Sequence, residues 1–204
     1  MKKAMLVLLV ALLSVATVNA QFKVGLRAGF NASTISNLPD IAGVVDVSNY
    51  YLPGFQAGLM AQYLITPQFG IESGLYFSQL GTKQEFTLLG AKTSKIWKPY
   101  YLQLPLTVLY KIDAGLGLFL SPQVGGYLGY GVGGKIKTGN TEDDFFNDNR
   151  NNFDAGLTFG FNVEHSGFVI GLGYDLGLLK INKNDLPGGD LKNGNIKVTV
   201  GYFF

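Results

Sequence analysis

The strongest constraint on this chain is a two-residue alternation that recurs eight times, always with one face free of charge. In the first such segment, residues 22–31, apolar side chains alternate without a break with Lys, Gly, Arg and Asn. Period two places successive side chains on opposite faces of a strand. The eight segments are residues 22–31, 55–64, 69–78, 101–111, 116–130, 153–164, 168–177 and 196–204. We therefore predict an all-β chain of eight strands.

The connections between these segments alternate in length. Residues 65–68, 112–115 and 165–167 are tight turns. The other connections are long, polar and rich in Gly, Asn, Asp and Lys; they are residues 32–54, 79–100, 131–152 and 178–195. An even number of strands of about ten residues, with short turns and long loops in alternation, is typical of outer-membrane barrels. The pattern predicts an eight-stranded antiparallel up-and-down transmembrane β-barrel, with the short turns and both termini in the periplasm.

A soluble eight-stranded barrel is the structural alternative, and the polarity of the two faces argues against it. A soluble barrel keeps its apolar face inside. Here the apolar face carries no charge in any segment, as a lipid-facing exterior requires, because Lys or Arg at mid-bilayer costs about 2–4 kcal/mol. The polar face carries four bases and four acids: Lys23, Arg27, Glu72, Lys111, Asp154, Glu164, Asp175 and Lys197. Since so narrow an interior is filled by side chains, we expect these charges to pair in a lumen network that plugs the barrel.

Aromatic residues on the apolar face cluster toward the strand ends. Rings of this kind settle at the headgroup level of a membrane. We predict a periplasmic aromatic girdle of Phe22, Tyr63, Phe69, Tyr110, Phe161, Phe168, Tyr202 and Phe204.

The first twenty residues are predicted to be a cleaved signal peptide, which leaves residues 21–204 as one barrel domain. Lys2 and Lys3 precede an uncharged run, and Val18-Asn19-Ala20 supplies the small residues that a signal peptidase reads. The run is too short for a membrane-spanning helix. Without Lys2 and Lys3 the 16 bases of the chain fall to equal its 14 acids, which disfavours a nucleic-acid partner. With no Cys there is no thiol nucleophile and no thiolate metal site.

Three loop motifs resemble parts of known binding sites, but the surrounding sequence favours a structural or solvated role for each. Gly129, Gly131 and Gly134 match G-x-G-x-x-G, but Ile136 stands where a phosphate loop needs Ser or Thr, and residues 135–140 indicate an extended arm and a turn. The acids at 142–144 and 148 do not fit an EF-hand and favour a solvated loop tip over a calcium site. A basic loop can contact lipopolysaccharide phosphates or simply be solvated; its bases are Lys83, Lys92, Lys95 and Lys98.

The sequence gives no support for catalysis. His165, the only histidine, falls in a short turn on the predicted periplasmic side. Outer-membrane hydrolases and acyl transferases usually need a base near the outer rim, beside Ser or a carboxylate. We therefore expect no enzymatic activity, with no catalytic residue, cofactor or metal.

Several segments make the chain resemble the small outer-membrane β-barrel domains of Bacteroidetes, the PorT-like or porin-family group. The resemblance rests on residues 53–59 (PGFQAGL), 72–81 (ESGLYFSQLG), 101–106 (YLQLPL), 171–178 (GLGYDLGL) and 198–204 (VTVGYFF). The chain departs from the family pattern at Gln103, where Glu is usual. The resemblance implies an outer-membrane location and recognition of the terminal Phe204 by the insertion machinery. One branch of the family assists protein secretion and gliding.

The leading functional hypothesis is a monomeric plugged barrel in contact with lipid bilayer and lipopolysaccharide, acting through its surface loops as a binding module. The alternatives are a narrow pore or transport protein, and an accessory of a protein-secretion system.

Overall fold

A computed structural model describes most of the chain after the predicted signal peptide. The described residues are 21–36, 46–88, 91–139, 141–146, 150–183 and 190–204, so the predicted signal peptide lies outside them. Within these ranges, no helix is long and apolar enough to cross a membrane.

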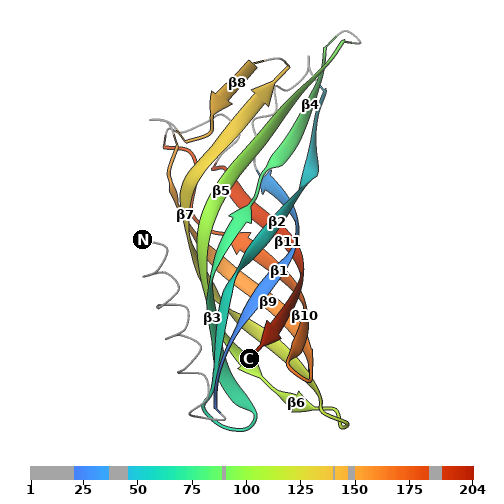
Figure 1. The fold of residues 1–204 in the computed structure, drawn as a ribbon. Helices are drawn as coiled ribbons and strands as arrows, with labels where there is room; N and C mark the ends of the chain where they lie inside the picture. Colours follow the sequence, from blue (N-terminus) through green and yellow to red (C-terminus); the bar gives the residue numbers. More distant parts are fainter. Residues whose placement is uncertain (1–20, 37–45, 89–90, 140, 147–149, 184–189) are drawn as a thin grey trace, which may run out of the picture.

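Eight strands in the described residues form a closed antiparallel ring (Figure 1). They are β1 (Phe22–Ser36), β2 (Asp46–Leu64), β3 (Phe69–Gln79), β5 (Ala91–Tyr110), β7 (Leu118–Thr138), β9 (Phe153–His165), β10 (Phe168–Gly177) and β11 (Lys192–Phe203). Each pairs with the next, and β11 pairs back with β1, so that Leu26 lies opposite both Leu59 and Tyr202. The prediction of an eight-stranded antiparallel barrel is confirmed.

The two ends of the barrel differ in their connections. At one end, called the turn end below, the chain makes short reversals; β6 (Ile112–Asp113) lies there, and the C-terminal strand finishes there. Leu116 belongs to one of these reversals, with φ of 55°, so β7 begins at Leu118 rather than at the predicted 116. The opposite end, called the loop end, carries the long connections.

The long connections contain more strand than the sequence pattern predicted. β2, β5 and β7 continue past the ring for several residues, to lengths of 19, 20 and 21 residues. β4 (Thr82–Leu88) fills the place between β2 and β5 where β3 has ended, and β8 (Thr141–Asp144) pairs with the end of β7. Together these strands form an extension that rises above the ring at the loop end (Figure 1). The connections predicted at 79–100 and 131–152 therefore contain strand as well as loop, and the extended arm predicted from residue 135 corresponds to the end of β7.

The two faces of the ring strands are opposite in character. Leu, Val, Ile and aromatic side chains stand exposed on the exterior, as with Leu104, Leu106 and Val108 on β5, while polar side chains are buried inside. In the extension the arrangement reverses: Trp97 and Ile136 point inward and are buried, whereas Lys135 and Lys137 face outward and are exposed.

A β-bulge resets the alternation of β7 where the ring meets the extension. Tyr101 pairs with Gly131 and Tyr100 pairs with Gly133, so Val132 is an extra residue. One additional residue moves every following side chain to the other face. This shift brings Ile136 inside.

Candidate functional site

The interior of the barrel holds its charges in layers, beginning with a cluster at the turn end. Glu164 accepts Lys23 Nζ at 2.6 Å on one oxygen and Lys111 Nζ at 2.8 Å on the other. The Lys111 ammonium also lies 4.2 Å from the centroid of the Phe119 ring. Two bases and one acid give this layer a positive balance.

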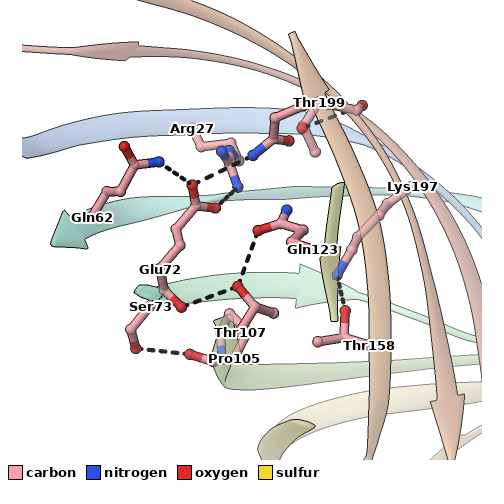
Figure 2. A network of polar contacts seen from close by, with 12 residues as sticks. Arg27, Gln62, Glu72, Ser73, Pro105, Thr107, Gln123, Thr158, Lys197 and Thr199 are labelled. Atoms are coloured by element: carbon pink, nitrogen blue, oxygen red, sulfur yellow. Dashed lines mark hydrogen bonds and ion pairs between the residues drawn. The ribbon is translucent and has the colours of Figure 1, made fainter. Parts of the chain in front are cut away.

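The middle layer is centred on an ion pair inside the lumen that joins β1 to β3 (Figure 2). Arg27 Nη1 donates to Glu72 Oε1 at 2.7 Å, and both side chains are almost fully buried. The other oxygen of Glu72 accepts longer bonds from the amides of Gln62 at 3.3 Å and Asn162 at 3.4 Å. Thr107 joins the layer by donating to the backbone of Glu72 or to Gln123.

The layer nearest the loop end contains two acids and one base. Lys197 Nζ lies 2.6 Å from Asp175, which also accepts from Thr158 at 2.6 Å. Asp154 differs from the expectation that every lumen charge pairs, because no described cation lies within 4.0 Å of it. Its Oδ2 accepts from Tyr127 at 3.1 Å and Asn193 at 2.8 Å, while its buried Oδ1 has no partner among the described residues.

Little open volume remains between these layers. The cavity beside the Arg27–Glu72 pair measures about 40 Å³, which is room for a few water molecules. Glycines on the inner face make space for the long side chains: a Cβ on Gly156 would lie 2.7 Å from the Tyr127 ring, and a Cβ on Gly173 would lie 2.7 Å from the Lys197 side chain.

An apolar cluster, called the cap below, lies at the loop end of the barrel. It consists of Ile35, Trp97, Ile136, Phe145, Ile181 and Leu191, all buried, with Phe146 packed against them. Phe146 meets Phe145 and the inward-facing Tyr101 edge to face, at 4.9 Å and 5.5 Å between centroids. A second, smaller apolar cluster fills the interior toward the turn end: Met60, Tyr76, Val169 and Phe203.

Two cations lie at the rim of the cap. Lys95 Nζ is 5.3 Å from the Trp97 ring centroid, and the Arg150 guanidinium carbon is 4.8 Å from the rings of both Trp97 and Phe145. Arg150 also donates to the Phe145 carbonyl at 2.8 Å. Burial lowers the pKa of both groups, and the proximity of Arg150 lowers the pKa of Lys95 further.

A family model for the outer membrane protein beta-barrel domain matches residues 17–183, well over half of the chain. The chain belongs to this family. The outer membrane is therefore its location, and lipid is the solvent of the exposed apolar band.

Comparison with curated proteins found no match. Among solved structures, the barrel is similar to the attachment invasion locus protein Ail of Yersinia pestis, at 15% identity and a TM-score of 0.44, covering 90% of this chain and 99% of that one. OprG from Pseudomonas aeruginosa shares 12% identity at a TM-score of 0.46, covering 90% and 96%. Neisserial surface protein A shares 13% identity at a TM-score of 0.43, covering 90% of this chain and 97% of that one. No function transfers at these values.

The predicted girdle residues of this outer-membrane barrel lie on its exterior. Phe69 meets Tyr110 and Phe168 meets Tyr202, each pair at 4.9 Å between centroids. Phe22 lies opposite Tyr63 in the β1–β2 register, near the turn end. Phe204 is exposed beside Tyr202, while its neighbour Phe203 points inward. Phe161 lies further from the turn end, opposite Leu172.

The extension disperses the basic residues that the sequence grouped together. Lys83 pairs with Glu85 at 2.7 Å, and Lys95 points toward Trp97 rather than outward. Lys98 occupies the outer face of β5, and the Lys92 side chain lies outside the described structure. The described side chains of Lys83, Lys95 and Lys98 therefore do not form a single patch for lipopolysaccharide phosphates.

The acidic and glycine-rich motifs of the extension have structural explanations. Asp144 pairs with Lys135 at 3.1 Å, and Glu142 pairs with Lys137 across the β7–β8 hairpin. Asp148 lies outside the described residues. No group of three His, Cys, Asp or Glu that could hold a metal occurs in the part of the chain that the structure describes. The G-x-G-x-x-G glycines belong to β7 and its bulge, with no helix after them.

Sequence reasoning missed the aromatic and apolar side chains that occupy the interior. Tyr101 and Tyr127 hold positions that strict alternation assigns to the polar face. In the interior the Tyr127 hydroxyl donates to Asp154, and the Tyr101 hydroxyl accepts from Asn193. The cap was missed because its members come from several separate connections. The local signal was present in the alternation Lys135-Ile136-Lys137.

Proposed function

We propose that this outer-membrane barrel is closed to solutes and serves as an anchor that presents its extension at the cell surface as a binding module. The Arg27–Glu72 pair, which lies buried in the lumen beside a cavity of only about 40 Å³, carries this proposal. An eight-stranded barrel is just wide enough for side chains to fill. With the apolar cap above the pair, an ion entering from the loop end meets two successive barriers.

Conductance in a planar bilayer tests the closure. We expect the wild-type barrel to give no steady current, and the double variant R27A/E72A, which removes both central side chains, to conduct more. The matched control is K137A/E142A, which removes an exposed pair on the hairpin. Steady ion-selective openings of the wild-type protein would refute the closed barrel and favour the narrow pore.

The proposed orientation places the loop end outside the cell and the turn end, with both termini of the mature chain, in the periplasm. The chain has no Cys, so single cysteines can report on each side. A membrane-impermeant maleimide added to intact cells should label T138C on the extension and should label L116C only after permeabilisation. Labelling in the reverse order would overturn the orientation.

The rest of the proposal concerns assembly and activity. We infer a monomer, inserted by machinery that reads the strand ending at Phe204, with lipid and lipopolysaccharide as its surroundings. We infer no enzymatic role, since His165 ends β9 at the turn end, far along the chain and the barrel from the extension. Deletion of residues 198–204 should abolish membrane insertion while leaving synthesis intact; normal insertion of the truncated chain would contradict recognition of this strand.

A further inference from the structure

The rim of the cap contains a concentration of positive charge around a single indole ring. Lys95 and Arg150 both lie against Trp97, at 5.3 Å and 4.8 Å from its centroid. Neither has a carboxylate within ion-pair distance among the described residues, in contrast to Lys83, Lys135 and Lys137 around them. Partly buried charges are normally neutralised by a partner, so two neighbouring cations without one indicate a place for an anion.

A second observation at the same ring points to an acceptor. The indole N–H of Trp97 is buried and has no hydrogen-bond partner among the described residues. A buried donor without an acceptor is uncommon and calls for an explanation. Asp143 is the acid close enough to act on Lys95, but it forms no ion pair with it in the described structure. Among the described residues, the group of Lys95, Trp97 and Arg150, called the Trp97 site below, therefore has an excess of positive charge.

We propose that the Trp97 site binds a phosphate group; this inference deepens the proposed surface-binding function and rests on it. A guanidinium presents a planar fork of donors, an ammonium adds a compact point charge, and the indole adds one directed donor. A tetrahedral phosphate has enough oxygens to accept from all three, and its charge-assisted bonds are the stronger kind. Lys95 and Arg150 are both half-buried, so the site keeps access to water at the loop end. The phosphate is either free in the medium or carried by lipopolysaccharide.

Trp97 is the only tryptophan in the chain, so its fluorescence reports on the site directly. We would titrate the folded protein in detergent micelles with inorganic phosphate, at constant ionic strength, and follow Trp97 emission. We expect a saturable change in the wild-type protein and about a tenfold weaker affinity in K95Q, the effect of losing one charged hydrogen bond. K98Q is the matched control, one residue beyond Trp97 on the opposite face of β5, and should bind as the wild type does.

A variant of the second cation, R150Q, can disturb the chain near Phe145, because Arg150 donates a hydrogen bond to the Phe145 carbonyl. Quenching of Trp97 fluorescence is a second measurement that does not depend on this variant. Iodide, an anionic quencher, should quench Trp97 more effectively than neutral acrylamide does, and phosphate should protect against iodide. K95Q should remove this preference because it removes one of the two cations beside the ring. The variant should fold normally, because the Lys95 side chain contacts Trp97 and forms no ion pair among the described residues. Heat-modifiable gel migration verifies the fold of each variant.

Parallel titrations with inorganic phosphate and with lipopolysaccharide distinguish the two sources of phosphate, and they also define the results that would overturn the proposal. A response to inorganic phosphate alone assigns a free anion, and a response to lipopolysaccharide as well assigns both sources. Absence of a saturable response to inorganic phosphate, an equal response to acetate, or unchanged affinity in K95Q would overturn the Trp97 site. None of these results affects the conductance or cysteine-labelling experiments, so the closed surface-binding barrel and the Trp97 site are tested independently.

Discussion

Removal of one partner of the Arg27–Glu72 pair should destabilise the barrel far more than removal of both. Arg27→Met leaves the Glu72 carboxylate nearly fully buried with only two amide bonds, at 3.3 Å and 3.4 Å, in place of the 2.7 Å ion pair. Breaking a buried pair in this way costs about 3–5 kcal/mol. Because the remaining amides and the small cavity of about 40 Å³ solvate Glu72 in part, we expect a loss near the lower limit, about 3 kcal/mol. The double variant R27M/E72M should lose about 1 kcal/mol, since two apolar side chains of similar volume replace the pair.

Reversible urea unfolding in detergent micelles, followed by Trp97 emission and by circular dichroism, measures these free energies. The double-mutant cycle should return a coupling of at least about 2 kcal/mol between the two residues. The exposed Lys137–Glu142 pair is the control, and its cycle should give a much smaller coupling, because water screens both charges. If the losses for R27M and E72M simply add in the double variant, the lumen charges are solvated independently and the reasoning for a tightly filled lumen is wrong.

Further predictions test the interior, the exterior and the hairpin. Gly156→Ala places a Cβ 2.7 Å from a tyrosine ring of β7 and should lower the free energy of unfolding by about 1–3 kcal/mol, whereas Gly133→Ala, whose Cβ meets nothing within 4 Å, should change it by less than about 0.5 kcal/mol. Leu104→Arg on the exterior should cost about 2–4 kcal/mol in lipid vesicles, against a small change for Leu104→Met; equal stabilities would argue against lipid contact at this position. The pKa of the Glu142 carboxyl lies below its ordinary 4.5 because Lys137 bonds to it, so the hairpin is stabilised above that pH and loses the contribution as pH falls through the lowered pKa. Amide exchange in β8 should therefore accelerate in acid, and E142Q should remove the dependence.

Most of the ring could be predicted from the sequence because one physical rule applies along every ring strand. Lipid outside and packed polar groups inside demand alternation, and a face without charge can only be the lipid face. The extension could not be predicted in the same way, since water lies on its outside and the rule reverses there. The reversal occurs within β7 through one extra residue, Val132, and periodicity alone does not reveal a bulge.

The charge network could be anticipated in composition but not in detail. Equal numbers of acids and bases on one face predict pairing. In the structure two of the bases, Lys23 and Lys111, share one acid, Glu164. The partner of each charge depends on strand register and side-chain height, which alternation leaves open. For this reason the sequence could not indicate that Asp154 lies without a cation, or that Tyr127 supplies its hydrogen bond instead.

Two charges without an ion-pair partner among the described residues lie on the two sides of the cap. Below it, Asp154 accepts from Asn193, whose amide reaches the hydroxyl of Tyr101 at 3.5 Å. Above it, Arg150 packs on Phe145, and the rings of Phe145 and Phe146 continue to Tyr101 at 4.9 Å and 5.5 Å. Three aromatic rings thus separate an acid from a base that are only four residues apart in the chain. Direct pairing of the two would lower the electrostatic free energy but would need a polar path through the cap. The fold keeps the apolar barrier, and among the described residues neither charge has an ion-pair partner. This is consistent with closure of the lumen and leaves Arg150 available to an anion from outside.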